Sequence, residues 1–251
     1  MQEYILIYGT SFSSWYAFAF LATIVGCAVT LLLRPKDFQV DAAGLAVLCL
    51  LAVILAYSGG YFVSFMIRWP VYVFHRIPHP FRTATGGYAF LGKAGGVALA
   101  ALVFAKCRKK KMSFLMLMDY GSPLIMLSQS IVRIGCFAQG CCSGRPTDLP
   151  WGCIFHGKLP PRHPTQVYEI IYLLFIFLVM RNVYRKNPPT GTVFFGTFLL
   201  YGFFRFFNEF LRFDGRVILG PITFAHLTMA ALVIVCAAGL LKVRHKGDVS
   251  L

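Results

Sequence analysis

Long apolar segments recur along the whole chain and are separated by shorter polar stretches. A helix that crosses a membrane needs about 20 mainly apolar residues. Segments of that length fall near residues 15–33, 46–67, 86–106, 114–137, 166–184, 191–212 and 221–242. The pattern predicts an all-α polytopic membrane protein, a bundle of about seven transmembrane helices that forms one integral membrane domain over residues 1–251.

Basic residues in the connecting stretches predict the orientation of this bundle. Alternate connections carry short clusters of lysine and arginine, which mark cytoplasmic loops. We therefore expect the N-terminus outside and the C-terminus in the cytoplasm. The outer loops, near 68–85, 136–164 and 213–221, hold most of the histidines and many prolines. We expect the chemistry on that outer face.

Composition agrees with a chain surrounded by lipid. Of the 251 residues, 58% are hydrophobic and 13% are charged, against about 25% charged in soluble domains. The net charge of +15 could suggest nucleic acid as a partner. The basic residues lie between apolar segments, however, and no nucleic-acid motif accompanies them. We expect contact with anionic lipid headgroups and no nucleic acid.

Several charged residues lie inside the apolar segments, where charge is costly and usually faces a partner or a wet cavity. Arg133 ends the fourth segment, while Tyr201, Arg205, Glu209 and Arg212 follow one another at about one helical turn in the sixth. The stripe could be a self-neutralising Glu–Arg pair with Arg212 reaching the headgroups. We favour a phosphate clamp, because a guanidinium binds two phosphate oxygens at once.

The start of the fifth segment combines a helix-start pattern with unusual polar residues. Thr165 is a plausible N-cap, and Glu169 follows near the helix start, where a negative charge is favourable. A helix start alone does not require His163, Gln166 and Tyr168 so close together. We therefore interpret this segment as part of a site or as its support.

Three motifs in this order resemble the bacterial prolipoprotein diacylglyceryl transferase family over roughly residues 86–235. The upstream positions Asp119, Pro123 and Gln129 extend the resemblance. The motifs are Gly135-Cys136-Phe137 after Arg133, His163-Pro164-Thr165-Gln166-x-Tyr168-Glu169, and Tyr201-Gly202-x-x-Arg205-Phe206-x-x-Glu209-x-x-Arg212.

The resemblance implies an enzyme of the bacterial cytoplasmic (inner) membrane that moves a diacylglyceryl group from phosphatidylglycerol to the lipobox cysteine of a prolipoprotein. A thioether forms, glycerol phosphate leaves, and no metal or organic cofactor takes part. Motif-matching arginines would hold the lipid phosphate and stabilise the leaving charge. The predicted catalytic residues are Arg133, Arg205, Glu209, Tyr201 and His163, and the predicted substrate-binding residues are Lys93, Gln129, Gln166, Tyr168, Glu169 and Arg212.

One departure from the family concerns the acceptor. Leu91 stands where the family has a histidine, and Lys93 replaces a glycine. Leucine cannot take a proton from a thiol. Lys93 could act as the base or as a phosphate ligand, and His163, His75 and His79 are other candidate bases. A paralogue with an anionic phospholipid donor and another acceptor is the alternative, as is a non-catalytic lipid-binding or transport protein.

The second departure is a cysteine-rich outer loop that contains Cys136, Cys141, Cys142 and Cys153. Disulfides between Cys136 and Cys141, or between Cys142 and Cys153, are conceivable, whereas neighbouring Cys141 and Cys142 are hard to join. The spacing matches no standard zinc pattern. We expect no metal and interpret these cysteines as small residues that line a turn.

Overall fold

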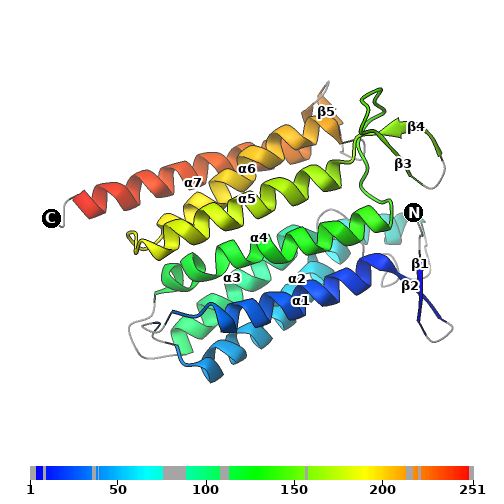
Figure 1. The fold of residues 1–251 in the computed structure, drawn as a ribbon. Helices are drawn as coiled ribbons and strands as arrows, with labels where there is room; N and C mark the ends of the chain where they lie inside the picture. Colours follow the sequence, from blue (N-terminus) through cyan, green and yellow to red (C-terminus); the bar gives the residue numbers. More distant parts are fainter. Residues whose placement is uncertain are drawn as a thin grey trace. The chain divides into compact units, whose positions relative to one another are not determined.

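The computed structural model describes residues 4–7, 10–35, 38, 40–75, 89–107, 113–155, 158–212, 217–219 and 222–248. Helices dominate these ranges, and the only sheets within them are three two-stranded antiparallel hairpins, β1–β2, β3–β4 and β5–β6 (Figure 1). The helices are α1 (Ser14–Leu32), α2 (Ala42–His75), α3 (Ala89–Cys107), α4 (Phe114–Ala138), α5 (Thr165–Arg185), α6 (Thr192–Leu211) and α7 (Phe224–Asp248). The strands are β1 (Tyr4–Ile7), β2 (Thr10–Ser13), β3 (Cys153–Phe155), β4 (Lys158–Arg162), β5 (Val217–Leu219) and β6 (Ile222–Thr223).

The helices follow the predicted apolar segments, with one clear difference. Helix α2 is longer than the segment predicted at 46–67 and stays helical to His75, within the stretch near 68–85 that we predict to be an outer loop. Apolar and aromatic residues continue past position 67, so the chain has no strong signal to end the helix there. Residues 76–88, which complete that loop and include His79, lie outside the described residues, as does the side chain of His75.

Four described helices are long and apolar enough to cross a membrane, at Trp15–Leu32, Ala42–Val63, Thr165–Arg185 and Phe224–His245. The all-α membrane class is thereby supported. The other three helices carry ionisable residues along their length, such as Lys93 in α3, Asp119 in α4 and Arg205 in α6. Such residues lower the hydropathy of a helix without preventing it from crossing a bilayer.

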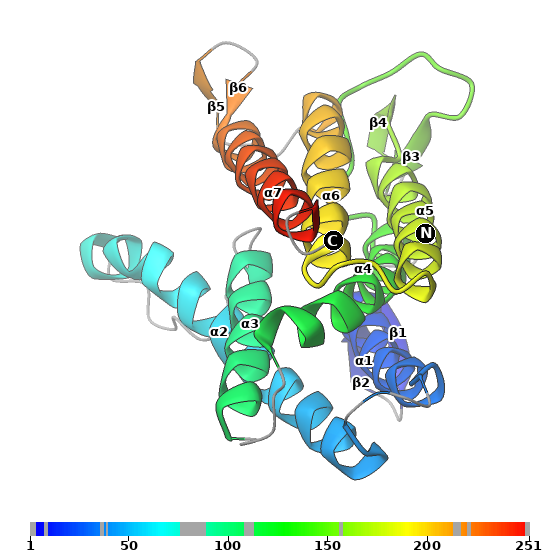
Figure 2. The same ribbon diagram turned by 90° about the vertical axis from the view of Figure 1, so that its left-hand side faces the viewer.

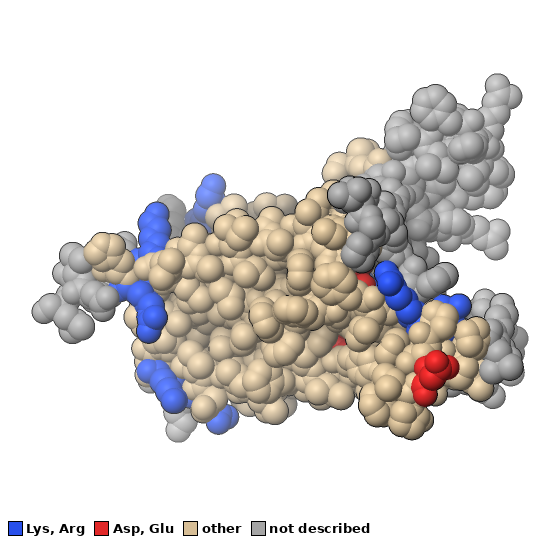
Figure 3. Space-filling model, turned by 90° about the horizontal axis from the view of Figure 1, so that it is seen from above, with Lys and Arg blue, Asp and Glu red and all other residues tan. Residues whose placement is uncertain are grey.

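Large apolar side chains face outward from these helices. Ile234 and Val235 on α7 are 69% and 63% exposed, and Ile171 and Leu178 on α5 are similarly open. On the face seen in Figure 3, described charged side chains gather towards the ends of the helices, and the surface between them is uncharged. A soluble protein rarely exposes apolar patches this broad, so this surface is suited to lipid chains.

The chain divides into two compact units, one made of Met1–Val29 with Asp119–Leu251 and the other of Thr30–Met118. In the second unit α2 and α3 pack along each other (Figure 2). Glycines make this approach close, since a Cβ atom on Gly59 would lie only 2.5 Å from the carbonyl oxygen of Gly92. Small residues at a helix crossing are a common way for membrane helices to pack.

In the first unit α6 lies between α5 and α7 (Figures 1 and 2). Helix α4 is tied to α6 by a buried hydrogen bond from Ser122 Oγ to Thr197 Oγ1 at 3.3 Å. The β3–β4 and β5–β6 hairpins lie at the same end of this layer (Figure 1). That end holds the C-terminus of α4, the start of α5, the end of α6 and the start of α7.

Asp119 of α4 caps the start of α6 from outside that helix. Its carboxylate accepts hydrogen bonds from the backbone N–H groups of Gly191, at 2.5 Å, and Phe194, at 2.7 Å. The first N–H groups of a helix have no partner within it, and a carboxylate there also opposes the positive end of the helix dipole. Asp119 therefore fixes where α6 begins relative to α4.

We expect Asp119→Asn to lower the stability of the purified protein by about 1–2 kcal/mol, because an amide cannot accept both N–H bonds as a charged group does. The midpoint of thermal unfolding in detergent is the measurement. Ser122→Ala is the matched control on the same two helices and should cost less. Equal midpoints for the two variants would contradict the capping role.

Candidate functional site

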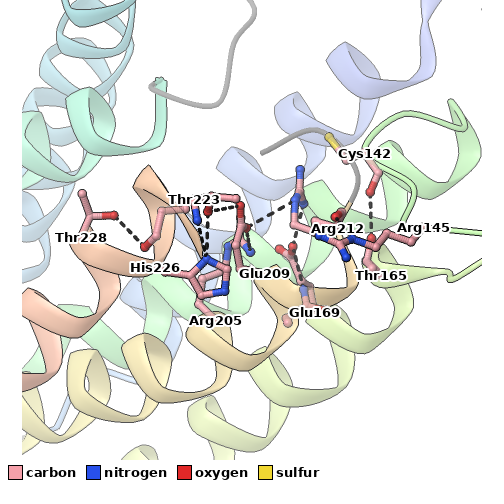
Figure 4. A network of polar contacts seen from close by, with 12 residues as sticks. Cys142, Arg145, Thr165, Glu169, Arg205, Glu209, Arg212, Thr223, His226 and Thr228 are labelled. Carbon is pink, nitrogen blue, oxygen red and sulfur yellow. Dashed lines mark hydrogen bonds and ion pairs between the residues drawn. The ribbon is translucent and has the colours of Figure 1, made fainter. Parts of the chain in front are cut away.

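Charged and polar side chains from four helices meet at the hairpin end of the first unit (Figure 4). They come from the end of α4, the first two turns of α5, the last two turns of α6, and the β6–α7 junction. All are substantially buried, whereas large apolar side chains such as Ile171 of α5, Phe203 of α6 and Ile234 of α7 are exposed. The site is therefore a polar interior under an apolar exterior.

The Glu169 carboxylate is the first centre of this network. It forms an ion pair with Arg133 Nε, and its Oε1 accepts from Arg212 Nη1 at 3.1 Å and from Asn208 Nδ2 at 3.2 Å. Its side chain is 1% exposed, and that of Arg133 is 15% exposed. One buried carboxylate thus connects the ends of α4, α5 and α6.

The Glu209 carboxylate is the second centre. Its Oε2 lies 2.6 Å from Arg205 Nη1 and 3.8 Å from Arg212 Nε, and its Oε1 accepts from Thr223 Oγ1 at 3.0 Å. Arg212 contacts both carboxylates, so it joins the two centres into one network of alternating charges (Figure 4). The order is Arg133, Glu169, Arg212, Glu209, Arg205.

The described part of this network is rich in arginine. Among the described side chains, three guanidinium groups face two carboxylates in a place where water is largely excluded. A buried guanidinium can bind a carboxylate and a phosphate through its separate N–H groups. The electrostatics therefore favour an anionic ligand beside the arginines.

One buried hydroxyl without a hydrogen-bond partner lies close to this network. In the part of the protein that the structure describes, the Tyr172 hydroxyl has no such partner. Tyr172 stacks on Phe204 at 5.5 Å between ring centroids and lies within electrostatic range of Glu169, Tyr201 and Arg205. Native proteins satisfy nearly all buried polar groups, so this hydroxyl is suited to a bound molecule.

Residues at the β6–α7 junction hold the Glu209 carboxylate in place. The Thr223 N–H donates to His226 Nδ1 at 3.0 Å, while the Thr223 hydroxyl donates to Glu209. The His226 ring packs against Phe206 and Phe210, at 5.1 and 4.2 Å between centroids. Because Nδ1 accepts a hydrogen bond, the proton of the neutral ring lies on Nε2. His226 is thus held as a structural support for the carboxylate.

The outer loop between α4 and α5 is hydrogen-bonded to the end of α6. Backbone hydrogen bonds run from Gly144 N to His163 O at 2.8 Å and from Arg145 N to Leu211 O at 2.8 Å. A Cβ atom on Gly144 would lie 2.6 Å from the Leu211 carbonyl oxygen, so the contact requires glycine. This loop closes the hairpin end of the helices.

Thr165 does not cap α5, which corrects the sequence prediction. Pro164 occupies the cap position, and no side chain caps the helix there. The Thr165 hydroxyl donates to the Cys142 carbonyl at 2.8 Å, and Gln166 Nε2 donates to the Cys141 carbonyl at 2.6 Å. Both side chains therefore hold the loop between α4 and α5.

Three loop cysteines cluster beside Arg133. The Sγ atoms of Cys136, Cys141 and Cys142 all lie within 4.8 Å of one another, and Arg133 Nη1 lies 3.9 Å from Cys136 Sγ. Hydrogen bonds from the Cys136 and Cys141 thiols, with the charges of Arg212 and Arg133 behind them, lower the pKa of the Cys142 thiol. All four loop cysteines are free thiols. Cys153 is not part of the cluster, and its Sγ lies 3.7 Å from the Trp151 carbonyl oxygen.

The other predicted site residues fall into three places. His163 Nδ1 lies 3.3 Å from the Tyr168 hydroxyl, which accepts from Trp151 Nε1 at 2.8 Å. Gln129 is half-buried on α4, one turn before Arg133. Lys93 belongs to the other unit, where its Nζ lies 5.1 Å from the Tyr57 ring centroid. The arginine network therefore gathers Arg133, Glu169, Arg205, Glu209 and Arg212, with the buried Tyr201 one turn before Arg205 on α6.

Four residues that touch or border this network are not among the predicted site residues: Tyr172, Asn208, Thr223 and His226. Asn208 and Tyr172 have a signal in the sequence, since each is a polar group inside an apolar helix at a spacing that faces a predicted site residue. Thr223 and His226 have no such signal, because they lie at the start of the last predicted apolar segment.

The chain is similar in sequence to known proteins over most of its length. Residues 5–242 match the family described as prolipoprotein diacylglyceryl transferase. The phosphatidylglycerol–prolipoprotein diacylglyceryl transferase of Geobacter sulfurreducens is 34% identical over 210 residues, which cover 78% of this chain and 79% of that protein. Its counterpart in Aeromonas salmonicida is 39% identical over 169 residues, 64% of this chain and 58% of that protein, and the one in Pseudoalteromonas atlantica is 44% identical over 135 residues, 53% and 47%.

Two of these three matches thus span about half of the relative's length, while the Geobacter match and the family match run through most of this chain. The matched range contains every charged residue of the arginine network. The chain belongs to the prolipoprotein diacylglyceryl transferase family.

Proposed function

We propose that this protein transfers a diacylglyceryl group from phosphatidylglycerol to the lipobox cysteine thiol of a prolipoprotein. The names of its relatives supply the reaction. The observation that carries the proposal for this chain is the buried network of Arg133, Arg205 and Arg212, which would bind the anionic phosphate of the donor among helices with lipid-facing exteriors.

The reaction exchanges one bond at the glyceryl carbon for another. The thiolate sulfur of the acceptor attacks that carbon, the carbon–oxygen bond to phosphate breaks, and glycerol phosphate leaves with the electron pair. Arg205 and Arg133 would stabilise the growing negative charge, with Glu209 and Glu169 holding the two guanidinium groups in place. Desolvation strengthens such interactions relative to water.

The acceptor thiol must lose a proton, and our candidate base is His163. Its Nδ1 is held towards the Tyr168 hydroxyl at 3.3 Å, so that Nε2 is the nitrogen available to a substrate. The ring lies on the loop that closes the hairpin end of the helices, where an acceptor peptide from outside the membrane would arrive. Tyr201 and Arg212 would line the donor site, and Gln129, Gln166 and Tyr168 would support its edges.

The orientation of this site in a membrane is part of the proposal. All seven described helices would cross the bacterial cytoplasmic membrane, with the N-terminus outside and the C-terminus in the cytoplasm. Basic residues at the ends of α5 and α7 opposite the site support this, since Arg181, Arg185, Lys242 and Arg244 follow the pattern of cytoplasmic ends. The arginine network would then face the outer leaflet.

A second candidate function follows from the departure at Leu91 and Lys93. A paralogue would keep the anionic phospholipid donor and use an acceptor other than a lipobox thiol. Purified protein, phosphatidylglycerol and a lipobox peptide, analysed by mass spectrometry, separate the two. A peptide that gains one diacylglyceryl group at cysteine supports our proposal, with the cysteine-to-serine peptide as control. Consumption of phospholipid with an unchanged peptide supports the paralogue, and lipid binding without turnover contradicts both.

We expect Arg205→Lys to reduce the rate of transfer by at least about ten-fold, equivalent to ~1.4 kcal/mol of lost transition-state stabilisation. An ammonium group keeps the charge, but it cannot pair with Glu209 and a phosphate through one rigid fork. Arg181→Lys, at the opposite end of α5 over the Tyr120 and Tyr184 rings, is the matched control. Near-normal transfer by Arg205→Lys would count against the clamp.

For His163→Gln we expect a loss of about a hundred-fold in transfer near pH 7, the range for removal of a general base. The loss should shrink as pH rises towards about 8.5, the ordinary pKa of a cysteine thiol, because the acceptor then ionises without help. Rates of wild type and variant across this pH range are the measurement. A ratio that stays constant with pH would show that His163 is not the base.

A further inference from the structure

The three clustered cysteines of the outer loop have no part in the reaction proposed above. Cys136 is the last-turn residue of α4, and Cys141 and Cys142 lie in the turn that follows. Their sulfur atoms point to one place, within 4.8 Å of one another. We infer that Cys136, Cys141 and Cys142 form a binding site for one thiophilic metal cation, such as Zn²⁺.

The spacing of these cysteines along the chain matches no standard zinc pattern. The positions of their three sulfur atoms, however, suit one metal ion. Zinc binds thiolates at about 2.3 Å, which sets sulfur atoms about 3.8 Å apart in a tetrahedral site. The described sulfurs lie within 4.8 Å of one another, close to that separation. Three protein thiolates leave one position open, and soft ligands of this kind select Zn²⁺, Cd²⁺ and Cu⁺ over harder cations.

The backbone of the turn holds the sulfurs in this arrangement. The Cys141 N–H donates to the Cys136 carbonyl at 3.1 Å, which closes the end of α4. Cys142 has a φ of +63°, a left-handed conformation that is uncommon for residues other than glycine. Side chains of α5 also fix the turn, since Gln166 and Thr165 donate to the carbonyls of Cys141 and Cys142.

The surrounding charge suits a metal–thiolate centre. Three thiolates with one divalent cation carry a net negative charge, which the neighbouring Arg133 offsets. Its Nη1 lies 3.9 Å from Cys136 Sγ. The centre would brace the turn that adjoins Arg133, so that metal binding would stabilise the loop without entering the transfer reaction.

A disulfide is the competing state of these residues. Two of the three thiols could be oxidised to one bridge on the outer face of a membrane. That state would leave one thiol unused, and a bridge between the neighbouring Cys141 and Cys142 would be strained. A metal uses all three sulfurs at once, which matches their mutual proximity.

Titration of the full-length protein with Cd²⁺ tests the site. The protein is purified in detergent, reduced, freed of metal and titrated while the sulfur-to-cadmium charge-transfer absorption is recorded. We expect one Cd²⁺ per chain, displaced by Zn²⁺. Cys141→Ser and Cys142→Ser should each weaken binding by more than about ten-fold. Cys153→Ser, in the same loop but outside the cluster, should bind as the wild type does.

A second readout separates metal binding from loss of the fold. Zn²⁺ should raise the midpoint of thermal unfolding of the wild type and of Cys153→Ser, since a ligand that binds only the folded state stabilises it. It should leave Cys141→Ser and Cys142→Ser unchanged. Binding that is equally tight in all variants would overturn the site. So would a disulfide within the cluster of membrane-extracted protein, found by alkylation before reduction and peptide mass spectrometry.

Discussion

The buried carboxylate of Glu169 holds two guanidinium groups from two other helix ends, and the arrangement of the site depends on that interaction. Arg133 arrives from α4 and Arg212 from the end of α6, while Glu169 itself stands in the second turn of α5. Without the carboxylate, two positive charges would remain in a region with little water, at a cost of several kcal/mol. The pairing therefore fixes three helix ends relative to one another as well as the charges.

The same interaction explains why the network is poised for an anion. Arg212 is shared with Glu209, and Glu209 holds Arg205, so two carboxylates restrain three guanidinium groups. The two carboxylates give the three arginines fixed positions, from which the guanidinium groups can bind a phosphate. The apolar exterior of α5 and α7 excludes water from the network. The loop between α4 and α5, hydrogen-bonded to the Leu211 carbonyl, covers the hairpin end of these helices.

Much of this arrangement could be predicted because it rests on local periodicity. The positions of the helices follow from apolar segment length, and Tyr201, Arg205 and Glu209 share a face because they lie one turn apart on one helix. Contacts between segments could not be read in this way. The sequence shows only that Glu169 lies near a helix start, whereas its partners are 36 and 43 residues away along the chain.

The remaining differences between the sequence predictions and the structure also come from contacts between distant segments. Asp119 caps a helix that begins 73 residues later, and Thr165 binds a loop carbonyl instead of its own helix, because in both cases tertiary contacts supply what local sequence usually supplies. The cysteine cluster is similar, since two residues in a turn and one in a helix show no recognised spacing. The proximity of their sulfurs depends on a positive φ at Cys142 that the sequence does not reveal.

Whether the arginines bind an anionic headgroup is measured by lipid retention on the purified protein. Native mass spectrometry of protein offered equal amounts of phosphatidylglycerol and zwitterionic phosphatidylcholine reports which lipid stays bound. We expect the wild type to retain phosphatidylglycerol preferentially, and Arg133→Gln with Arg205→Gln to abolish the preference. Equal retention of the two lipids by the wild type, or an undiminished preference in the double variant, would contradict this expectation.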